Sequence, residues 1–131
     1  MPHGWERGKL AAASEWLPPE DRALMQAFLQ DGKSADELAK LIGVSGRTVR
    51  RRVERLARRV SSPRFVFVGT RLSQMTPMRR RIAEACILRG MSIRAAAARL
   101  KLSTHAVRLH LAAIHALCGH SPRRSPDNSW R

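Results

Sequence analysis

Carboxylates are scarce in the second half of this 131-residue chain, and tyrosine is absent throughout. After Glu54 only Glu84 and Asp127 are acidic, so the chain lacks the clustered carboxylates that hold divalent metal in nucleases and transposases. The absence of tyrosine excludes strand transfer through a phenolic nucleophile. There is also no glycine-rich phosphate loop and no nucleophile motif. We therefore expect a protein that binds a partner and is not an enzyme.

Long hydrophobic runs and cysteine clusters are missing as well. The apolar stretch at 10–13 is too short for a secretory signal, and acidic residues interrupt this region. Cys86 and Cys118 are too few for a disulfide framework, and with the nearby histidines they match no zinc-ligand spacing. We expect both cysteines to be small buried apolar residues, and we expect no metal, no cofactor and no membrane contact.

The charge balance is strongly basic. Lysine and arginine number 25 against 10 aspartate and glutamate residues, which gives a net charge of +15. Such an excess favours a polyanionic partner, because each neutralised phosphate releases condensed counterions. Double-stranded DNA is the expected partner, and the expected location is the cytoplasm, in association with the nucleoid.

The chain contains an internal repeat. Residues 17–60 align without a gap onto residues 75–118 at a constant offset of 58, with nine identities in 44 positions. Several identities, such as Ser45 and Ser103, are residue types that begin or end helices. A chain of this length has room for two small units. The sequence therefore predicts an all-α fold of two tandem units.

Residues 34–51 of the first copy have the pattern helix, tight turn, helix. Ser34 and Glu37 form a capping box that begins one helix, and Gly43 supplies the positive φ of a turn. Ser45 then caps a second helix, whose apolar residues recur at steps of four, three and four. The apolar residues are Val49, Val53, Leu56 and Val60. The opposite face carries Arg47, Arg50, Arg51, Arg55 and Arg58.

The pattern from Glu37 to Arg50 resembles the helix-turn-helix of sigma factor region four and of LuxR-type response-regulator DNA-binding domains. A generic helix with a solvated arginine face is the alternative, but a repeated pair of capped helices favours a DNA-reading unit. The resemblance implies that the capping serine, the residues directly after it and those one turn later contact DNA. These are Ser45, Gly46, Arg47, Arg50 and Arg51 in the first copy, and Ser103, Thr104, His105, Arg108 and Leu109 in the second. Arg55 and Arg58 extend the same basic face and are included in the expected DNA contact.

The second copy departs from this pattern. Lys101 replaces the turn glycine, so its turn is either strained by about 1 kcal/mol or shaped differently. Its second helix is apolar on more than one side, with Arg108 as its only Lys or Arg. We expect this helix to read fewer bases, to contact thymine methyl groups through Leu109, or to face another protein chain. Phosphate contacts, with a solvated charge run as the alternative, are expected from Arg79, Arg80 and Arg81.

The predicted segments are an N-terminal leader or short helix at 1–16, a first helix-turn-helix unit at 17–62, an extended linker at 63–76, a second unit at 77–119 and a basic flexible tail at 120–131. Within the linker, the β-branched and aromatic run at 64–69 is typical of a strand. A lone strand must pair, so we expect a homodimer through the Phe65 to Val68 segment, through the second unit, or through both.

Three functional hypotheses follow. The first is a sequence-specific transcriptional regulator, and the second is a sigma-factor-like protein that contacts RNA polymerase. The third is a DNA-organising or mobile-element accessory protein that binds largely through phosphates. Sequence-selective affinity separates the first from the third, and co-purification with RNA polymerase identifies the second.

Overall fold

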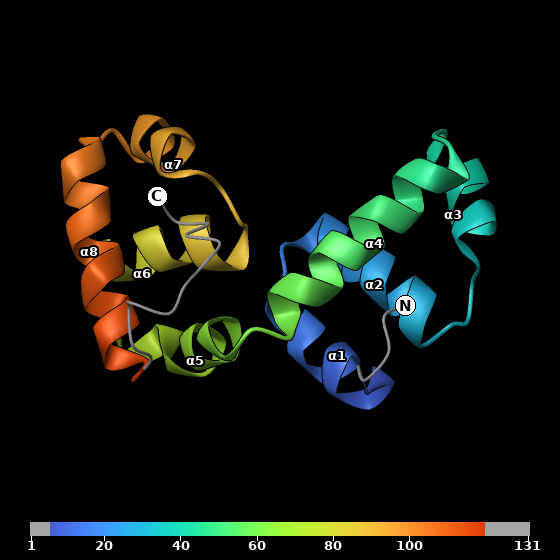
Figure 1. The fold of residues 1–131 in the computed structure, drawn as a ribbon, viewed down its shortest axis with the longest axis horizontal. Helices are drawn as coiled ribbons and strands as arrows, with labels where there is room; N and C mark the ends of the chain where they lie inside the picture. Colours follow the sequence, from blue (N-terminus) through green and yellow to red (C-terminus); the bar gives the residue numbers. More distant parts are fainter. Residues whose placement is uncertain (1–5, 120–131) are drawn as a thin grey trace. The chain divides into compact units, whose positions relative to one another are not determined.

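The residues that the computed structural model describes, 6–119, form helices joined by turns and contain no strand, which confirms the predicted all-α class (Figure 1). It divides into two compact units, Met1–Ser62 and Pro63–Arg131. The predicted basic tail at 120–131 lies outside the described residues, as do residues 1–5 of the predicted leader. No described helix is both long and apolar enough to cross a membrane.

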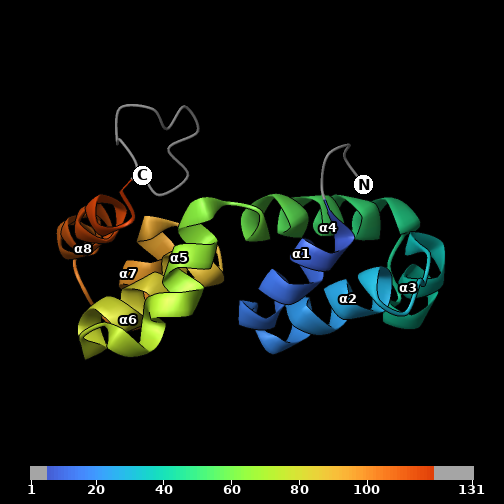
Figure 2. The same ribbon diagram turned by 90° about the horizontal axis from the view of Figure 1, so that it is seen from below.

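The first unit packs its helices around the last of them, α4. Its elements are α1 (Arg7–Ala13), the 3-10 helix η1 (Ser14–Trp16), α2 (Pro19–Leu29), α3 (Ala35–Ile42) and α4 (Gly46–Val60). Helix α4 contacts α1, α2 and α3 (Figure 2). The predicted apolar stripe of α4 is confirmed, because Val49, Val53, Leu56 and Val60 are all buried. They pack with Leu10, Leu24, Met25 and Leu38 of the other helices into one core.

The second unit has the same order of elements, except that a π-helical turn ends the segment that corresponds to the single helix α2 of the first unit. It comprises α5 (Pro63–Arg71), η2 (Leu72–Gln74), α6 (Pro77–Ala83), the π-helical turn η3 (Glu84–Leu88), α7 (Ile93–Leu100) and α8 (Thr104–Leu117). Helix α8 contacts α6 and α7, and α5 contacts η3. The core includes Phe65, Val68, Ile82, Ile93, Val107, Leu111 and Ile114.

The prediction of an extended linker with a strand at 64–69 is wrong. These residues belong to α5, and the connection between α4 and α5 is only Ser61 and Ser62. Phe65 and Val68 are three residues apart on one helical face, and both are fully buried. Burial of that face against η3 overrides the β-propensity of the run, because local propensity is weaker than tertiary packing. Neither side chain is exposed for pairing with a second molecule.

The repeat begins earlier than the sequence alignment indicates. Helix α5 ends and η2 begins and ends 58 residues after the corresponding points of α1 and η1. Each unit therefore starts with a helix and a 3-10 turn, in the segments predicted to be the leader and the linker. No identity exists between 7–16 and 65–74, although Leu10 and Val68 share the buried position. The two segments bury the same position with different residues, so the alignment of the two copies gave no sign of their equivalence.

The turns before α4 and α8 have the same shape. Gly43 has φ 89° and Lys101 has φ 60°, so both lie in the left-handed region. The backbone N–H of Val44 donates to Ala39 O at 3.1 Å, and that of Leu102 donates to the equivalent Ala97 O at 2.9 Å. Of the two alternatives for Lys101, the strained turn is therefore the one that occurs.

Relief of this strain is measurable. Lys101→Gly is expected to raise the free energy of unfolding by about 1 kcal/mol, because glycine adopts a positive φ without a Cβ clash. Lys101→Ala, the control, removes the charge but keeps the Cβ and is expected to give no such gain. Gly43→Ala should destabilise by a similar amount, since the added Cβ meets no atom within 4 Å and only backbone strain remains. Urea unfolding followed by circular dichroism compares the variants, and equal stability of Lys101→Gly and Lys101→Ala would contradict the strain.

The cysteines are less buried than predicted. Cys86 and Cys118 are both free and half-buried, and neither belongs to the fully enclosed core. Burial raises the pKa of the Cys86 thiol to about 11 and also raises the pKa of Cys118. Both thiols are therefore protonated at neutral pH. The described residues contain no group of three or more His, Cys, Asp or Glu side chains that could hold a metal.

Candidate nucleic-acid interface

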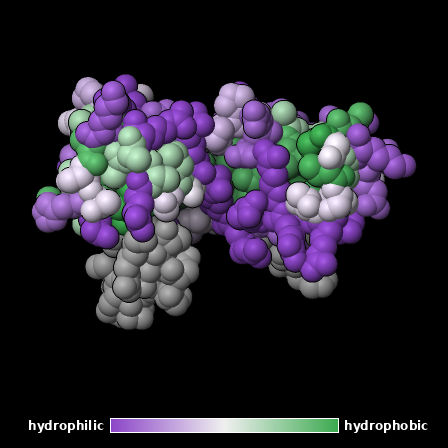
Figure 3. Space-filling view, turned by 90° about the horizontal axis from the view of Figure 1, so that it is seen from above, coloured by the Kyte–Doolittle hydropathy of each residue, from purple (hydrophilic) through white to green (hydrophobic). Residues whose placement is uncertain are grey.

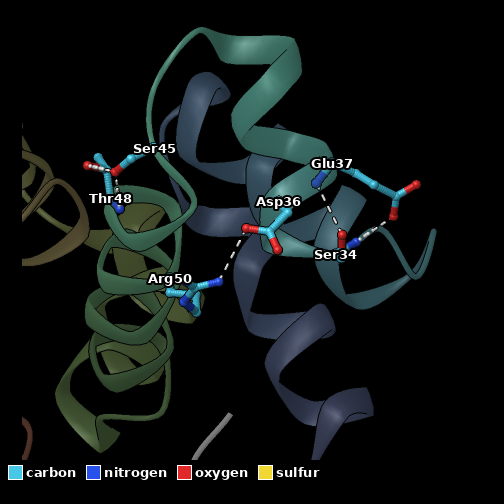
Figure 4. A network of polar contacts seen from close by, with 6 residues as sticks. All are labelled: Ser34, Asp36, Glu37, Ser45, Thr48 and Arg50. Atoms are coloured by element: carbon cyan, nitrogen blue, oxygen red, sulfur yellow. Dashed lines mark hydrogen bonds and ion pairs between the residues drawn. The ribbon is translucent and has the colours of Figure 1, made fainter.

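The two helices of the predicted motif, α3 and α4, begin at serine caps. Ser34 Oγ accepts a hydrogen bond from the Glu37 backbone N–H at 3.1 Å, and Glu37 Oε1 accepts one from the Ser34 N–H at 2.9 Å (Figure 4). The hydrogen bond from the Ser34 backbone lowers the pKa of Glu37. Ser45 Oγ accepts from the Thr48 backbone N–H at 3.1 Å and begins α4. Local hydrogen bonds thus fix where both helices start.

One side of α4 is held to the first unit by ion pairs. Arg52 Nη2 lies 2.7 Å from Asp21 Oδ1, and Arg59 Nη1 lies 3.9 Å from Asp21 Oδ2. Burial lowers the pKa of Arg59, and the nearby carboxylate of Asp21 opposes this effect. Because Asp21 lies on α2, these two arginines orient α4 and are not presented to solvent for a ligand.

Four other arginines of α4 form an exposed basic face opposite the buried stripe. Its members are Arg47, Arg51, Arg55 and Arg58, which recur at steps of four, four and three. Glu54 is exposed beside them, the only acidic residue of α4. The face begins next to the capping Ser45 and follows the helix to its end. We name these four residues the α4 arginine face.

Arg50 differs from the α4 arginine face. Its Nη1 lies 3.4 Å from Oδ1 of Asp36, on the first turn of α3, and both side chains are exposed. Figure 4 shows the Asp36 carboxylate reaching from α3 toward Arg50. A Cβ at Gly46 would lie only 2.1 Å from the same oxygen, so glycine leaves room for the carboxylate beside the first turn of α4. We name this contact of Asp36, Gly46 and Arg50 the α3–α4 corner.

Helix α8 begins like α4 but presents a different surface. Ser103 Oγ accepts from the Ala106 backbone N–H at 3.0 Å, and Arg108 Nη1 lies 3.5 Å from Thr104 Oγ1. Leu109 and Leu117 are each 59% exposed, where α4 has Arg51 and Arg59. The exposed alanines of this face are Ala112 and Ala116. The structure therefore places no arginine face on α8, and of the predicted contacts His105, Arg108 and Leu109 are exposed while Thr104 is half-buried.

Comparisons with known proteins do not assign the chain to a family. It matches no protein-family model, no curated protein and no solved structure. The resemblance to sigma factor region four and LuxR-type domains thus depends on the motif from Glu37 to Arg50.

The arginine triplet that begins α6 is not uniformly exposed. Arg80 Nη2 donates to the Met75 backbone carbonyl at 3.2 Å, much as Arg22 of the first unit donates to Glu15 O at 3.3 Å. Arg79 is half-buried, and Arg81 is exposed. Arg80 therefore holds α6 to the preceding turn, and Arg81 is the exposed member of the triplet.

Sequence reasoning missed two features of this surface. The first is the role of Asp21, although the seven-residue spacing of Arg52 and Arg59 indicates one shared helical side. The second is an exposed apolar group at the end of α3 and the following turn, and Figure 3 shows apolar side chains gathered on the first unit. Its members are Leu41, Ile42 and Val44, exposed by 74%, 49% and 43%.

Proposed function

We propose that this protein is a sequence-specific double-stranded DNA-binding protein with two helix-turn-helix units, and that it regulates transcription. The observation that supports the proposal most strongly is the α4 arginine face. It lies on a helix that is fixed at its start, along its buried face and along the side of Arg52 and Arg59. Ser45 fixes its start, the core holds its apolar stripe, and Asp21 holds Arg52 and Arg59. A helix held in this way has a fixed backbone, so only the arginine side chains have to become ordered when a ligand binds.

The spacing along α4 separates two kinds of contact. The helix rises about 1.5 Å per residue, so Arg58 lies about 16 Å along the axis from Arg47. The major groove is about 8.5 Å deep. When the N-terminal turns of α4 enter the groove, Arg47 and Arg51 meet base edges, whereas Arg58 stays at the level of the phosphates.

Base preference is expected to change in Arg47→Ala and Arg51→Ala. Each should lose about 1–3 kcal/mol on the preferred site and relax selection at one position, because arginine donates two hydrogen bonds to guanine O6 and N7. Arg58→Ala, the control on the same face, should weaken all sequences alike. Selection of duplexes from a random pool, followed by anisotropy titrations, measures both effects. Equal losses on selected and scrambled duplexes for all three variants would favour the DNA-organising alternative.

The apolar surface of α8 favours a different role for the second unit, contact with another protein chain. Its α8 presents Leu109 and Leu117 where α4 presents or pairs arginines. We propose this face as the contact with a second copy of the chain, in place of the buried Phe65 to Val68 segment. The first unit then supplies most of the base readout.

A further inference from the structure

The two units differ in charge far more than in their order of elements. Residues 6–62 contain twelve Lys and Arg against eight acidic residues, whereas residues 63–119 contain ten against Glu84 alone. The first unit can neutralise much of its own charge, as the pairs of Asp21 with Arg52 and Arg59 illustrate. The second unit has almost no carboxylate with which to do so.

The α3–α4 corner is one place where this difference changes a contact. At the offset of 58, Asp36 corresponds to Arg94 and Arg50 corresponds to Arg108. Arg94 lies on the first turn of α7, as Asp36 lies on the first turn of α3, and is exposed. An attractive pair in the first unit is thus replaced by two cations in the second.

The second-unit corner also lacks an internal counterion. Thr104 stands where Gly46 makes room for the Asp36 carboxylate, and its Oγ1 is near Arg108. Neither Arg94 nor Arg108 has an ion pair within the described residues. Two exposed arginines, at the positions equivalent to the Asp36–Arg50 pair, favour a bridging phosphate, because each guanidinium group can donate charge-assisted hydrogen bonds to its oxygens.

We propose that the corner of Arg94 and Arg108 is a phosphate-binding site that anchors the second unit to duplex DNA irrespective of sequence. In the first unit, the Asp36 carboxylate occupies the place of that phosphate beside Arg50. The carboxylate repels the DNA phosphates at this point, so α4 can bind only where its arginines contact base edges. Asp36 therefore contributes to sequence specificity. This phosphate site rests on the proposed DNA-binding function. Within that function, Arg94 and Arg108 bind phosphate and Asp36 limits binding to unselected sequences.

Paired charge variants of the full chain test the phosphate site. Arg94→Ala is expected to lower affinity for selected and scrambled duplexes by the same factor, about eightfold at about 0.1 M salt, and to make the log-log salt slope shallower by about 0.9. Arg89→Ala is the control, an exposed arginine that follows η3 and lies outside the corner. It should change affinity much less, because it does not belong to the proposed phosphate site.

The same titrations test Asp36. Asp36→Asn should strengthen binding to the scrambled duplex by about eightfold at about 0.1 M salt and reduce the ratio of selected to scrambled affinity. Asp31→Asn makes the same charge change at the position equivalent to Arg89 and should leave that ratio unaltered. Circular dichroism confirms that each variant is folded.

The outcomes distinguish this site from the function on which it rests. Wild-type protein that binds neither duplex would overturn the DNA-binding proposal itself. Wild-type protein that binds, with Arg94→Ala equal to Arg89→Ala, would overturn the phosphate site alone. If Asp36→Asn left the ratio of selected to scrambled affinity unchanged, the proposed role of Asp36 in specificity would be wrong.

Discussion

Affinity for duplex DNA is expected to fall about 10³–10⁵-fold between about 50 and 200 mM salt, with a log-log slope of about −5 to −9. This slope corresponds to roughly six to ten neutralised phosphates, each of which releases counterions. The described structure offers exposed cations in both units for these contacts, including Arg55, Arg58, Arg81, Arg94 and Arg108. Fluorescence anisotropy of a labelled duplex of about 20 base pairs, two helical turns, measures the slope.

A charge-reduced variant provides the control for this experiment. Arg55→Ala combined with Arg58→Ala should make the slope shallower by about 1.8, because two phosphate contacts are lost. The variant leaves the ion pairs of Asp21 untouched, so α4 stays in place. A slope near zero in the wild-type protein would exclude DNA as the main partner, whatever the sequence of the duplex.

Phe65→Ala is expected to destabilise the second unit by about 3–5 kcal/mol. Phe65 is fully buried on α5 and is the one aromatic side chain in the buried hydrophobic core of the described residues. Total stabilities of small domains are only about 5–15 kcal/mol, so the loss should shift or abolish one thermal transition. Thermal melting followed by far-ultraviolet circular dichroism measures it. Val66→Ala, on the exposed side of the same helix, should change stability by less than about 0.5 kcal/mol.

The experiment also checks the correction of the predicted strand pairing at Phe65 to Val68. If the Phe65 to Val68 segment paired between molecules as a strand, Phe65→Ala would dissociate dimers in light scattering and leave the melting temperature unaltered. The buried position of both side chains predicts the opposite order, in which unfolding precedes any change in assembly.

The helix starts that serine caps fix, above all those of α3 and α4, were predictable because they depend on neighbours in the sequence. Ser34, Ser45, Ser92 and Ser103 all accept a hydrogen bond from a backbone N–H three residues later. The apolar stripe of α4 was equally predictable, since its period places all four side chains on one face. The left-handed turn at Lys101 was foreseen only as one of two alternatives, because sequence does not show whether a backbone accepts strain.

Helix α5 was not predictable by the same reasoning. Its run of β-branched and aromatic residues is typical of a strand, and only contact with η3 makes the helical face of Phe65 and Val68 favourable. Its equivalence to α1 was equally hidden, because the two segments share a buried position and no identical residue.

The sequence by itself determined the all-α class, the offset of 58 between the units, the serine caps and the set of arginines on α4. Each of these follows from spacing within a few turns of chain or from composition. Only the tertiary structure decided which arginines form ion pairs within the protein. Arg52 bonds to Asp21 across 31 positions and Arg50 to Asp36 across 14, distances along the chain over which sequence spacing carries no geometric information. Folding brings those carboxylates to α4 and leaves Arg47, Arg51, Arg55 and Arg58 exposed.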